Sequence, residues 1–90
     1  MIIMYNELKT ELEMFLKYLN QSNDGMYGDV EKGKNSINDI IKSISSNKKI
    51  DKEKISLLIG PTANLQEISI DNGWEKEFLI IAEKIDKIIG

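Results

Sequence analysis

The stretch WEKEFLIIAEKIDKII, residues 74–89, carries an apolar side chain at almost every third or fourth position. That period gathers the apolar side chains on one face of an α-helix and leaves the charged ones on the other. The apolar face is expected to contain Trp74, Phe78, Ile81, Ile85 and Ile88. The stretch therefore predicts a long amphipathic helix whose two aromatic rings belong to the core. The DNG turn before it offers Asp71 or Asn72 as its N-cap.

The same period recurs upstream and predicts two further long helices. The first has its apolar face at Tyr5, Leu8, Leu12, Phe15 and Leu19, and the second at Val30, Ile37, Ile41 and Ile44, with Ile40 beside them. Asp29 is the expected N-cap of the second helix. Gly33 lies on the apolar face of that helix, where a missing side chain indicates a close crossing with a neighbouring helix.

Residues 51–68 predict shorter helical structure that is interrupted. Asp51 is the expected N-cap, and Gly60 is expected to end the first part in a left-handed conformation. Pro61 cannot continue that helix, although it can begin another. Because no stretch alternates as a strand does, the sequence predicts an all-α fold. The expected architecture is a compact antiparallel bundle of three long helices plus one short, broken helix, forming a single domain over residues 1–90.

The composition favours a protein that acts by binding. The chain has 90 residues and a net charge of −3, and it contains no histidine, no cysteine and no arginine. It therefore lacks the usual general base near neutral pH, the thiol nucleophile and the bidentate phosphate clamp. Neither an enzyme nor a bound cofactor is expected. The acidic balance also disfavours nucleic acid as a partner, since nucleic acid attracts basic surfaces.

The opening MIIMY, residues 1–5, is apolar but is followed closely by Asn6, Glu7 and Lys9. It is too short for the core of a signal peptide, and much shorter than the roughly 20 apolar residues that span a bilayer. We therefore expect a cytoplasmic protein without a membrane partner.

Residues 20–31, NQSNDGMYGDVE, have the outline of an EF-hand calcium loop, with glycine in the sixth place and glutamate in the twelfth. Position one is Asn20 instead of the usual aspartate, and Gly28 brings no side-chain ligand to position nine. Asp24 and Glu31 are then the only anionic ligands, too few to offset the dehydration of the ion. We expect an ordinary polar turn without a metal, and keep a calcium-binding helix-loop-helix as an alternative.

Acidic and aromatic side chains in this same turn indicate a protein-binding surface. Exposed tyrosine beside acidic groups is typical of interfaces, and Tyr18 also lies off the apolar face of its helix. The expected contact residues are Asp24, Tyr27, Asp29, Glu31, Glu67 and Glu75. Because these residues are placed outside the core, reversing the charges of Asp24 and Asp29 is expected to leave folding intact.

Residues 55–78, ISLLIGPTANLQEISIDNGWEKEF, resemble the second half of the small all-α immunity proteins that neutralise NAD(P)-degrading toxins of bacterial type VI and related secretion systems. In those proteins a short leucine-rich helix ends in glycine, a small residue follows three places later, and an acidic residue precedes the final helix. The matching positions are Leu57, Ile59, Gly60, Ala63, Asp71, Trp74 and Phe78. Residues around EKGKNSINDIIKSI, 31–44, look like the middle helix of that family.

The resemblance implies a toxin inhibitor that acts without catalysis. Such a protein binds its cognate toxin domain and covers the cofactor cleft, so that acidic side chains replace the dinucleotide phosphates. The alternative from composition is a homodimeric helical interaction module, whose self-interface would be closed by the apolar residues Ile2, Ile3, Met4, Met14 and Ile80.

Overall fold

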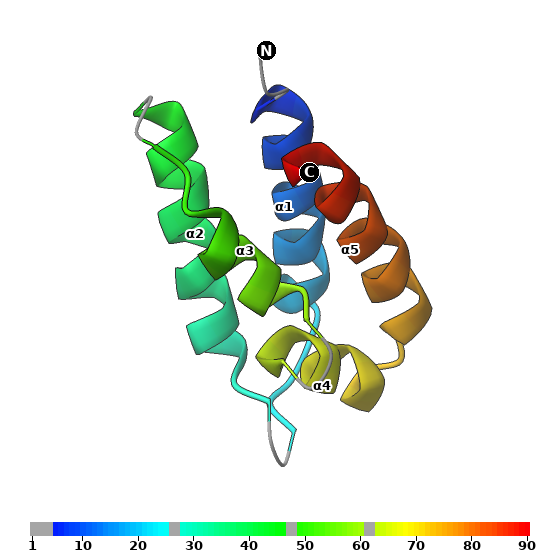
Figure 1. Cartoon of the computed structure of the whole chain (residues 1–90). Coiled ribbons are helices and arrows are strands. Elements are labelled where there is room, and N and C mark those ends of the chain that lie inside the picture. The colour runs from blue at the N-terminus through cyan, green and yellow to red at the C-terminus, as the bar shows by residue number, and fades with distance from the viewer. Residues whose placement is uncertain (1–4, 26–27, 47–48, 61–62) are drawn as a thin grey trace.

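The structure, a computed structural model, describes residues 5–25, 28–46, 49–60 and 63–90. Within these ranges every regular element is a helix, and no strand is present. The helices are α1 (Tyr5–Asn20), α2 (Val30–Ser45), α3 (Lys52–Leu58), α4 (Asn64–Asp71) and α5 (Glu75–Ile89), shown in Figure 1. The expected all-α class is confirmed.

The three long helices run along the long axis of the molecule. Figure 1 shows α1 running downward between α2 and α5, which both run upward, so α1 is antiparallel to each of its neighbours. The short helix α4 lies across the lower end and contacts both α2 and α5. The Cα radius of gyration is 12.4 Å, close to the ~12 Å typical of a compact chain of this length.

Where the sequence predicts one short, broken helix, the structure has two separate helices, α3 and α4. Asp51 caps α3 as expected, because its Oδ1 accepts a hydrogen bond from the Lys54 N–H at 3.1 Å. The left-handed glycine predicted at Gly60 is wrong, since Gly60 is not among the glycines of positive φ. Ala63 is the N-cap of α4, and Pro61 lies outside the described residues.

The left-handed glycine lies instead at the end of α4. Gly73 has φ of 80°, and the Trp74 N–H donates back to the Ser69 carbonyl at 2.8 Å. The Gly73 N–H donates to the Ile70 carbonyl at 3.4 Å. These two bonds form a Schellman motif with Asn72 as the C-cap of α4. The prediction that Asp71 or Asn72 caps the last helix is therefore wrong, because Trp74 takes the N-cap position of α5 without a side-chain bond.

One apolar core joins all five described helices. Its buried members are Leu8, Leu12, Phe15, Leu19, Val30, Ile37, Ile40, Ile44, Ile55, Leu65, Ile68, Trp74, Phe78, Ile81, Ala82, Ile85 and Ile89. The predicted apolar faces are confirmed with small departures: Tyr5 is only half-buried, and in two helices a neighbouring residue is buried instead of the expected one. Ile40 and Ile89 are buried where Ile41 and Ile88 were expected to be, because neighbouring positions at the edge of a helix face compete for the core.

Four aromatic rings pack at the junction of α1 and α5. The Trp74 ring stacks on Tyr18 with centroids 5.0 Å apart, and Phe15 stacks on Phe78 at 5.6 Å. Trp74 and Phe78 are buried, so their predicted place in the core is confirmed. Tyr18, which the sequence leaves off the apolar face, is half-buried because its ring covers the indole.

The close crossing predicted at Gly33 is confirmed. Gly33 is buried, and a Cβ added there would lie 3.2 Å from a methyl carbon of Leu65 and 3.5 Å from the amide nitrogen of Asn64. The missing side chain thus lets α2 approach the start of α4. None of the described helices combines the length with the apolar character needed to cross a membrane.

Candidate functional site

The segment between α1 and α2 lies along α4 and is held there by two asparagine side chains. At the end of α4, the Asn72 carboxamide accepts from the Asn23 N–H at 3.0 Å and donates to the Asn23 carbonyl at 2.9 Å. At the start of α4, the Asn64 carboxamide accepts from the Asp29 N–H at 2.7 Å and donates to the Asp29 carbonyl at 2.8 Å. Each carboxamide therefore forms a two-bond clamp on one residue of the segment.

Between the clamps, the backbone touches α4 directly at Gly28. Gly28 is buried, and a Cβ added there would lie 2.6 Å from Ile68 Cγ1 and 3.2 Å from the Ile68 main-chain nitrogen. No side chain fits between these two stretches of backbone, so only glycine allows this approach. From the sequence, Gly28 is predicted to be an ordinary turn residue, because no neighbouring residue in the chain indicates that α4 packs against it.

The start of the segment is tied to the aromatic cluster. The Trp74 indole N–H donates to the Ser22 Oγ at 2.9 Å, and the Ser22 hydroxyl donates to the Tyr18 carbonyl at 2.8 Å. This chain of bonds links the end of α1 to the start of α5. The described part of the segment is therefore anchored at its beginning, by Ser22 and Asn23, and at its end, by Gly28 and Asp29.

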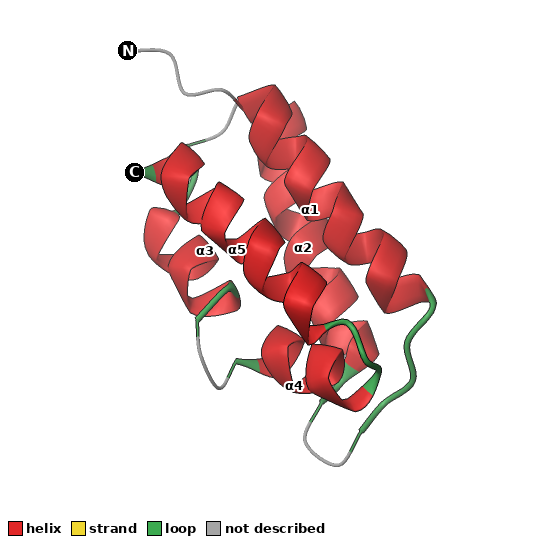
Figure 2. Ribbon diagram, turned by 90° about the vertical axis from the view of Figure 1, so that its right-hand side faces the viewer, coloured by secondary structure: helices red, strands yellow, loops and turns green. Residues whose placement is uncertain are grey.

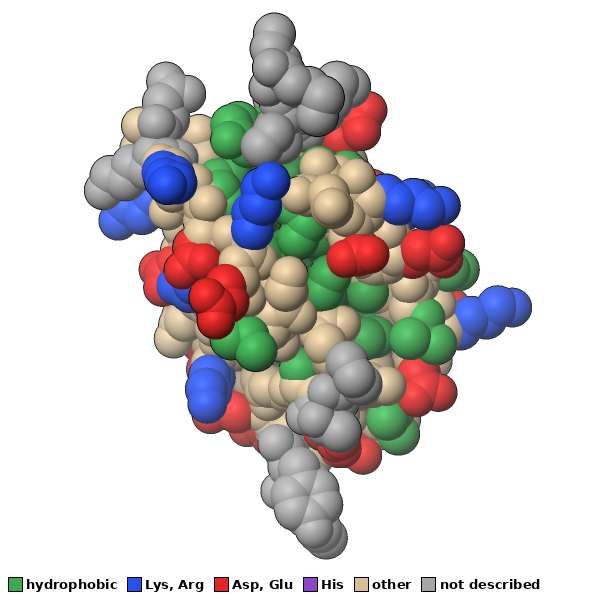
Figure 3. All heavy atoms as spheres, viewed as in Figure 1, with side chains coloured by type: hydrophobic (Ala, Val, Ile, Leu, Met, Phe, Trp, Pro, Cys, Tyr) green, Lys and Arg blue, Asp and Glu red, His purple; other side chains and the backbone are tan. Residues whose placement is uncertain are grey.

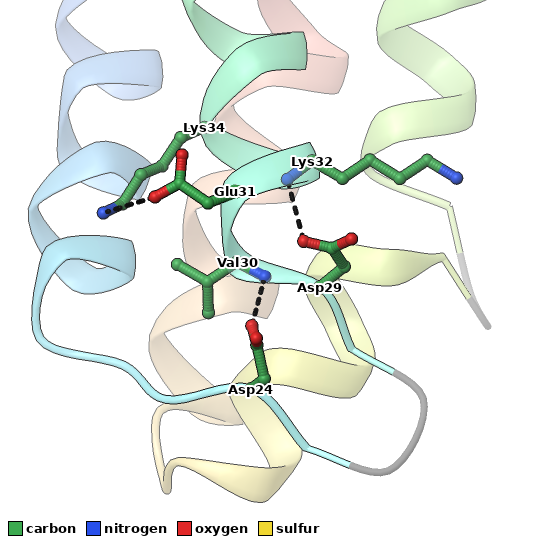
Figure 4. Close-up of polar contacts among 6 residues, drawn as sticks. All are labelled: Asp24, Asp29, Val30, Glu31, Lys32 and Lys34. Atoms are coloured by element: carbon green, nitrogen blue, oxygen red, sulfur yellow. Dashed lines mark hydrogen bonds and ion pairs between the residues drawn. The ribbon is translucent and has the colours of Figure 1, made fainter.

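Two of the predicted contact residues hold the start of α2, as Figure 4 shows. Asp24 Oδ1 accepts from the Val30 N–H at 2.8 Å, and Asp29 Oδ1 accepts from the Lys32 N–H at 3.0 Å. The predicted capping role of Asp29 is confirmed. Both aspartates are exposed at the surface. That reversing both charges leaves folding intact stays a prediction, but the variant is now expected to lose stability, because each reversal removes an acceptor from an N–H at the start of the helix.

Glu31 differs from the two aspartates because it makes no bond to the main chain of α2. Its carboxylate lies 3.7 Å from the Lys34 ammonium, and its side chain is 78% exposed. A pair this open contributes at most ~1 kcal/mol to stability. Figure 4 shows Glu31 on the first turn of α2, on the side where α1 passes, with Asp29 on the other side. Glu31 is thus available to a partner at little cost to the fold.

The acidic residues of α4 lie beside the clamped segment. Glu67 and Asp71 follow Asn64 at intervals of three and four, so they share its face of the helix. The Asp71 carboxylate occupies the space that a Cβ on Gly25 would need. Sequence reasoning missed Asp71 as a neighbour of this segment, because the two positions are far apart in the chain.

Glu75 is exposed in the first turn of α5, just after the Gly73 turn. The predicted contact residue Tyr27 lies outside the described residues. We refer to Asp24, Asp29, Glu31, Glu67 and Asp71 together as the acidic end. The structure brings these five residues of the turn, α2 and α4 to the same end of the bundle (Figure 1).

The structure disfavours the calcium-loop alternative, because the carboxylates that would bind the ion already have partners within the protein. Of the two anionic ligands it requires, Asp24 accepts a main-chain hydrogen bond and Glu31 pairs with a lysine. Across residues 5–25, 28–46, 49–60 and 63–90, no three or more histidine, cysteine, aspartate or glutamate side chains are grouped so that they could hold a metal ion. The described residues of the turn are held instead by main-chain hydrogen bonds to the side chains of Asn64 and Asn72.

The face shown in Figure 3 carries a mixture of hydrophobic, acidic and basic side chains. Hydrophobic side chains reach the surface near its centre, with acidic and basic side chains around them. A groove of about 430 Å³ lies between α2, α3 and α4, and Lys32 and Lys54 are its charged lining residues. Leu57, which is 70% exposed, also lines this groove.

No protein-family model, curated protein or solved structure matches this chain.

Proposed function

We propose that this chain is a cytoplasmic immunity protein that binds a cognate secreted bacterial toxin of the NAD(P)-degrading kind and covers its cofactor cleft, without turnover of its own. The observation that carries the proposal is the acidic segment held against α4 by the Asn64 and Asn72 clamps. That segment projects carboxylates from a backbone whose described ends are fixed before any partner arrives.

A fixed backbone supports inhibition because it reduces the cost of binding. Ordering a flexible loop on association costs free energy that is then lost from the affinity. Here the bonds from Asn64, Asn72 and Trp74 already hold the described residues at the two ends of the segment. An inhibitor that must outcompete a dinucleotide gains from such preorganisation, since more of its contact energy appears as affinity.

The charges of the acidic end support the choice of target. A cleft that holds a dinucleotide presents groups that favour negative charge, because the phosphates are anionic. Glu31 and Glu67 carry negative charge without capping α2 or clamping the segment, so they are the side chains best placed to face such a cleft. Opposite charges would also accelerate the encounter of the two proteins.

The resemblance at residues 55–78 supplies the toxin class. Of its matching positions, Trp74 and Phe78 lie in the core and Asp71 lies beside the clamped segment. The shared positions therefore support a common packing arrangement, while the contact surface is proposed from charge and exposure alone.

The test uses a charge reversal that spares the caps of α2. Glu31→Lys combined with Glu67→Lys should weaken binding to the toxin domain encoded beside this gene by about tenfold or more. The same variant should restore NAD(P) loss in cells that make both proteins. Calorimetry measures the affinity, and nucleotide assays on cell extracts measure the protection.

The matched control is Glu13→Lys combined with Glu53→Lys. It changes the net charge by the same amount at exposed positions of α1 and α3, away from the acidic end. This control should bind and protect like the parent chain. If both double variants behave alike, the acidic end is not the contact surface, and if the parent chain does not bind the neighbouring toxin, the proposed function is wrong.

A further inference from the structure

The outer face of α5 carries two large apolar side chains that no described element covers. Leu79 is 53% exposed and Ile80 is 48% exposed, although both belong to a helix whose other face is deep in the core. Figure 2 shows α5 nearest the viewer, with α1 to one side of it and α3 to the other. The two adjacent side chains therefore form an apolar strip along the outside of the bundle.

One charged residue lies on each side of the apolar pair Leu79 and Ile80 along the helix, at equal spacing. Lys76 lies three residues before Leu79, and Glu83 lies three residues after Ile80. All four side chains are exposed, and their spacings of three and four place them on one stripe of the helix. Read from either end, these four positions are a charge, two apolar residues and a charge, with the sign reversed from one end to the other, and Lys87 follows beyond Glu83 on the same face.

We infer that this stripe binds the same stripe of a second copy of the chain, with the two α5 helices antiparallel across a twofold axis. The axis passes between Leu79 and Ile80, so Leu79 of each copy meets Ile80 of the other. Lys76 then lies opposite Glu83 of the second copy, and Glu83 lies opposite Lys76 of the second copy. Such an interface is self-complementary, as a twofold dimer requires.

The charge order is what selects a second copy as the occupant. A parallel arrangement of two α5 helices would place Lys76 against Lys76 and Glu83 against Glu83, which is unfavourable. Only the antiparallel arrangement pairs opposite charges at both ends of the apolar strip. Among the described residues, the other large apolar side chains that are exposed, Leu57 and Ile70, lie on α3 and α4 and do not belong to this stripe.

Glu83 already has a neighbour on its own helix, and that contact is weak. Its carboxylate lies 3.4 Å from the Lys87 ammonium, and both side chains are at least 70% exposed. An open i,i+4 pair of this kind stabilises the helix only weakly. Glu83 can therefore contact Lys76 of the second copy at little cost.

This self-association is independent of the proposed toxin binding. The stripe consists of Lys76, Leu79, Ile80 and Glu83, and it shares no residue with the acidic end. The experiment contains no toxin, so its outcome does not depend on the immunity proposal.

Sedimentation of the purified chain should show a mass that rises with concentration from one chain to two and then stays at two. Lys76→Glu alone and Glu83→Lys alone each place like charges opposite one another twice, so each should raise the dimer dissociation constant by about tenfold or more. The double variant, Lys76→Glu with Glu83→Lys, should restore the affinity of the parent chain. Leu79→Lys combined with Ile80→Lys should abolish the dimer.

A mixture of the two single variants, Lys76→Glu and Glu83→Lys, tests the charge pairing most directly. One chain then offers only carboxylates and the other only ammonium groups, so the mixture should form a heterodimer as tight as the parent dimer. The control mixes Glu53→Lys with Lys54→Glu, which carry the same charge changes on α3 and should not alter dimerisation. Circular dichroism checks that every variant is folded. A parent chain that stays monomeric, or a double variant that fails to recover, overturns the inference.

Discussion

Asn64 and Asn72 supply from side chains the kind of bonding that a neighbouring strand would supply from its backbone. Each carboxamide gives one donor and one acceptor to a single residue of the turn, as a paired residue in an antiparallel sheet does. Each such bond contributes about 0.5–1.5 kcal/mol net. A protein with no strand in its described residues thereby holds non-helical backbone in place.

Gly28 should be the glycine of this segment that tolerates substitution least. Gly28→Ala would push a methyl group into the backbone and side chain of buried Ile68, and we expect a loss of about 1–3 kcal/mol in the free energy of unfolding. Gly25→Ala is the matched control, because its added atom meets only the Asp71 side chain, which is exposed and can move. Urea denaturation followed by Trp74 fluorescence measures both. Equal losses would mean that the turn does not lie against α4 at Gly28.

At the level of the helices, the start of α2 should depend on two carboxylates from the turn before it. Asp29→Ala removes a helix cap and should cost about 1 kcal/mol. Asp24→Ala leaves the Val30 N–H without its acceptor and should cost a similar amount. Glu31→Ala, which removes only an open ion pair, should stay within about 0.5 kcal/mol of the parent chain. Chemical denaturation of the three variants would contradict these roles if Glu31→Ala were the most damaging.

The sequence predicts the helices well because their apolar faces repeat with the period of the backbone. The prediction of the left-handed glycine at position 60 is wrong because the residue that follows Gly60 has no N–H. Gly60 and Gly73 both follow an apolar helical stretch, but a Schellman motif also needs an N–H on the next residue. Trp74 supplies that N–H to the Ser69 carbonyl, whereas proline at position 61 has none to give. The sequence alone therefore distinguishes Gly73 from Gly60, once the need for an N–H on the following residue is taken into account.

The acidic end was harder to predict because its bonds join distant parts of the chain. Asp29 could be identified as a cap, since its partner lies three residues away. The clamps join residues 35 and 49 positions apart, and no local pattern specifies that asparagine rather than another polar residue is required there. The packing of Gly28 on Ile68 depends on the same long-range arrangement.

At the scale of the whole molecule, unfolding should be a single cooperative transition. The buried core takes side chains from all five described helices, and Trp74 joins α1, α5 and the turn through stacking and its bond to Ser22. Helix content from far-UV circular dichroism and the environment of the only tryptophan should therefore change at the same denaturant concentration. Separate midpoints would show that the acidic end melts before the bundle.

The clamp at Asn72 also controls how fast this residue can deamidate. In an asparagine–glycine pair, the glycine nitrogen can attack the side-chain carboxamide and release ammonia, and hydrolysis of the resulting ring leaves aspartate or isoaspartate. Here the Gly73 N–H is bonded to the Ile70 carbonyl, and the Asn72 amide donates to the carbonyls of Asn23 and Ile68. The folded protein thus protects Asn72 until the segment lifts away from α4.

Deamidation at Asn72 should consequently report how often that opening occurs. Asn64→Ala releases the other end of the segment, and we expect it to speed deamidation in mildly alkaline solution, as measured by peptide mass spectrometry. An unchanged rate would mean that the two clamps open independently. Once Asn72 becomes a carboxylate, it faces two carbonyl oxygens with no hydrogen to offer them, so one slow chemical event loosens the clamp permanently and limits the working life of each molecule.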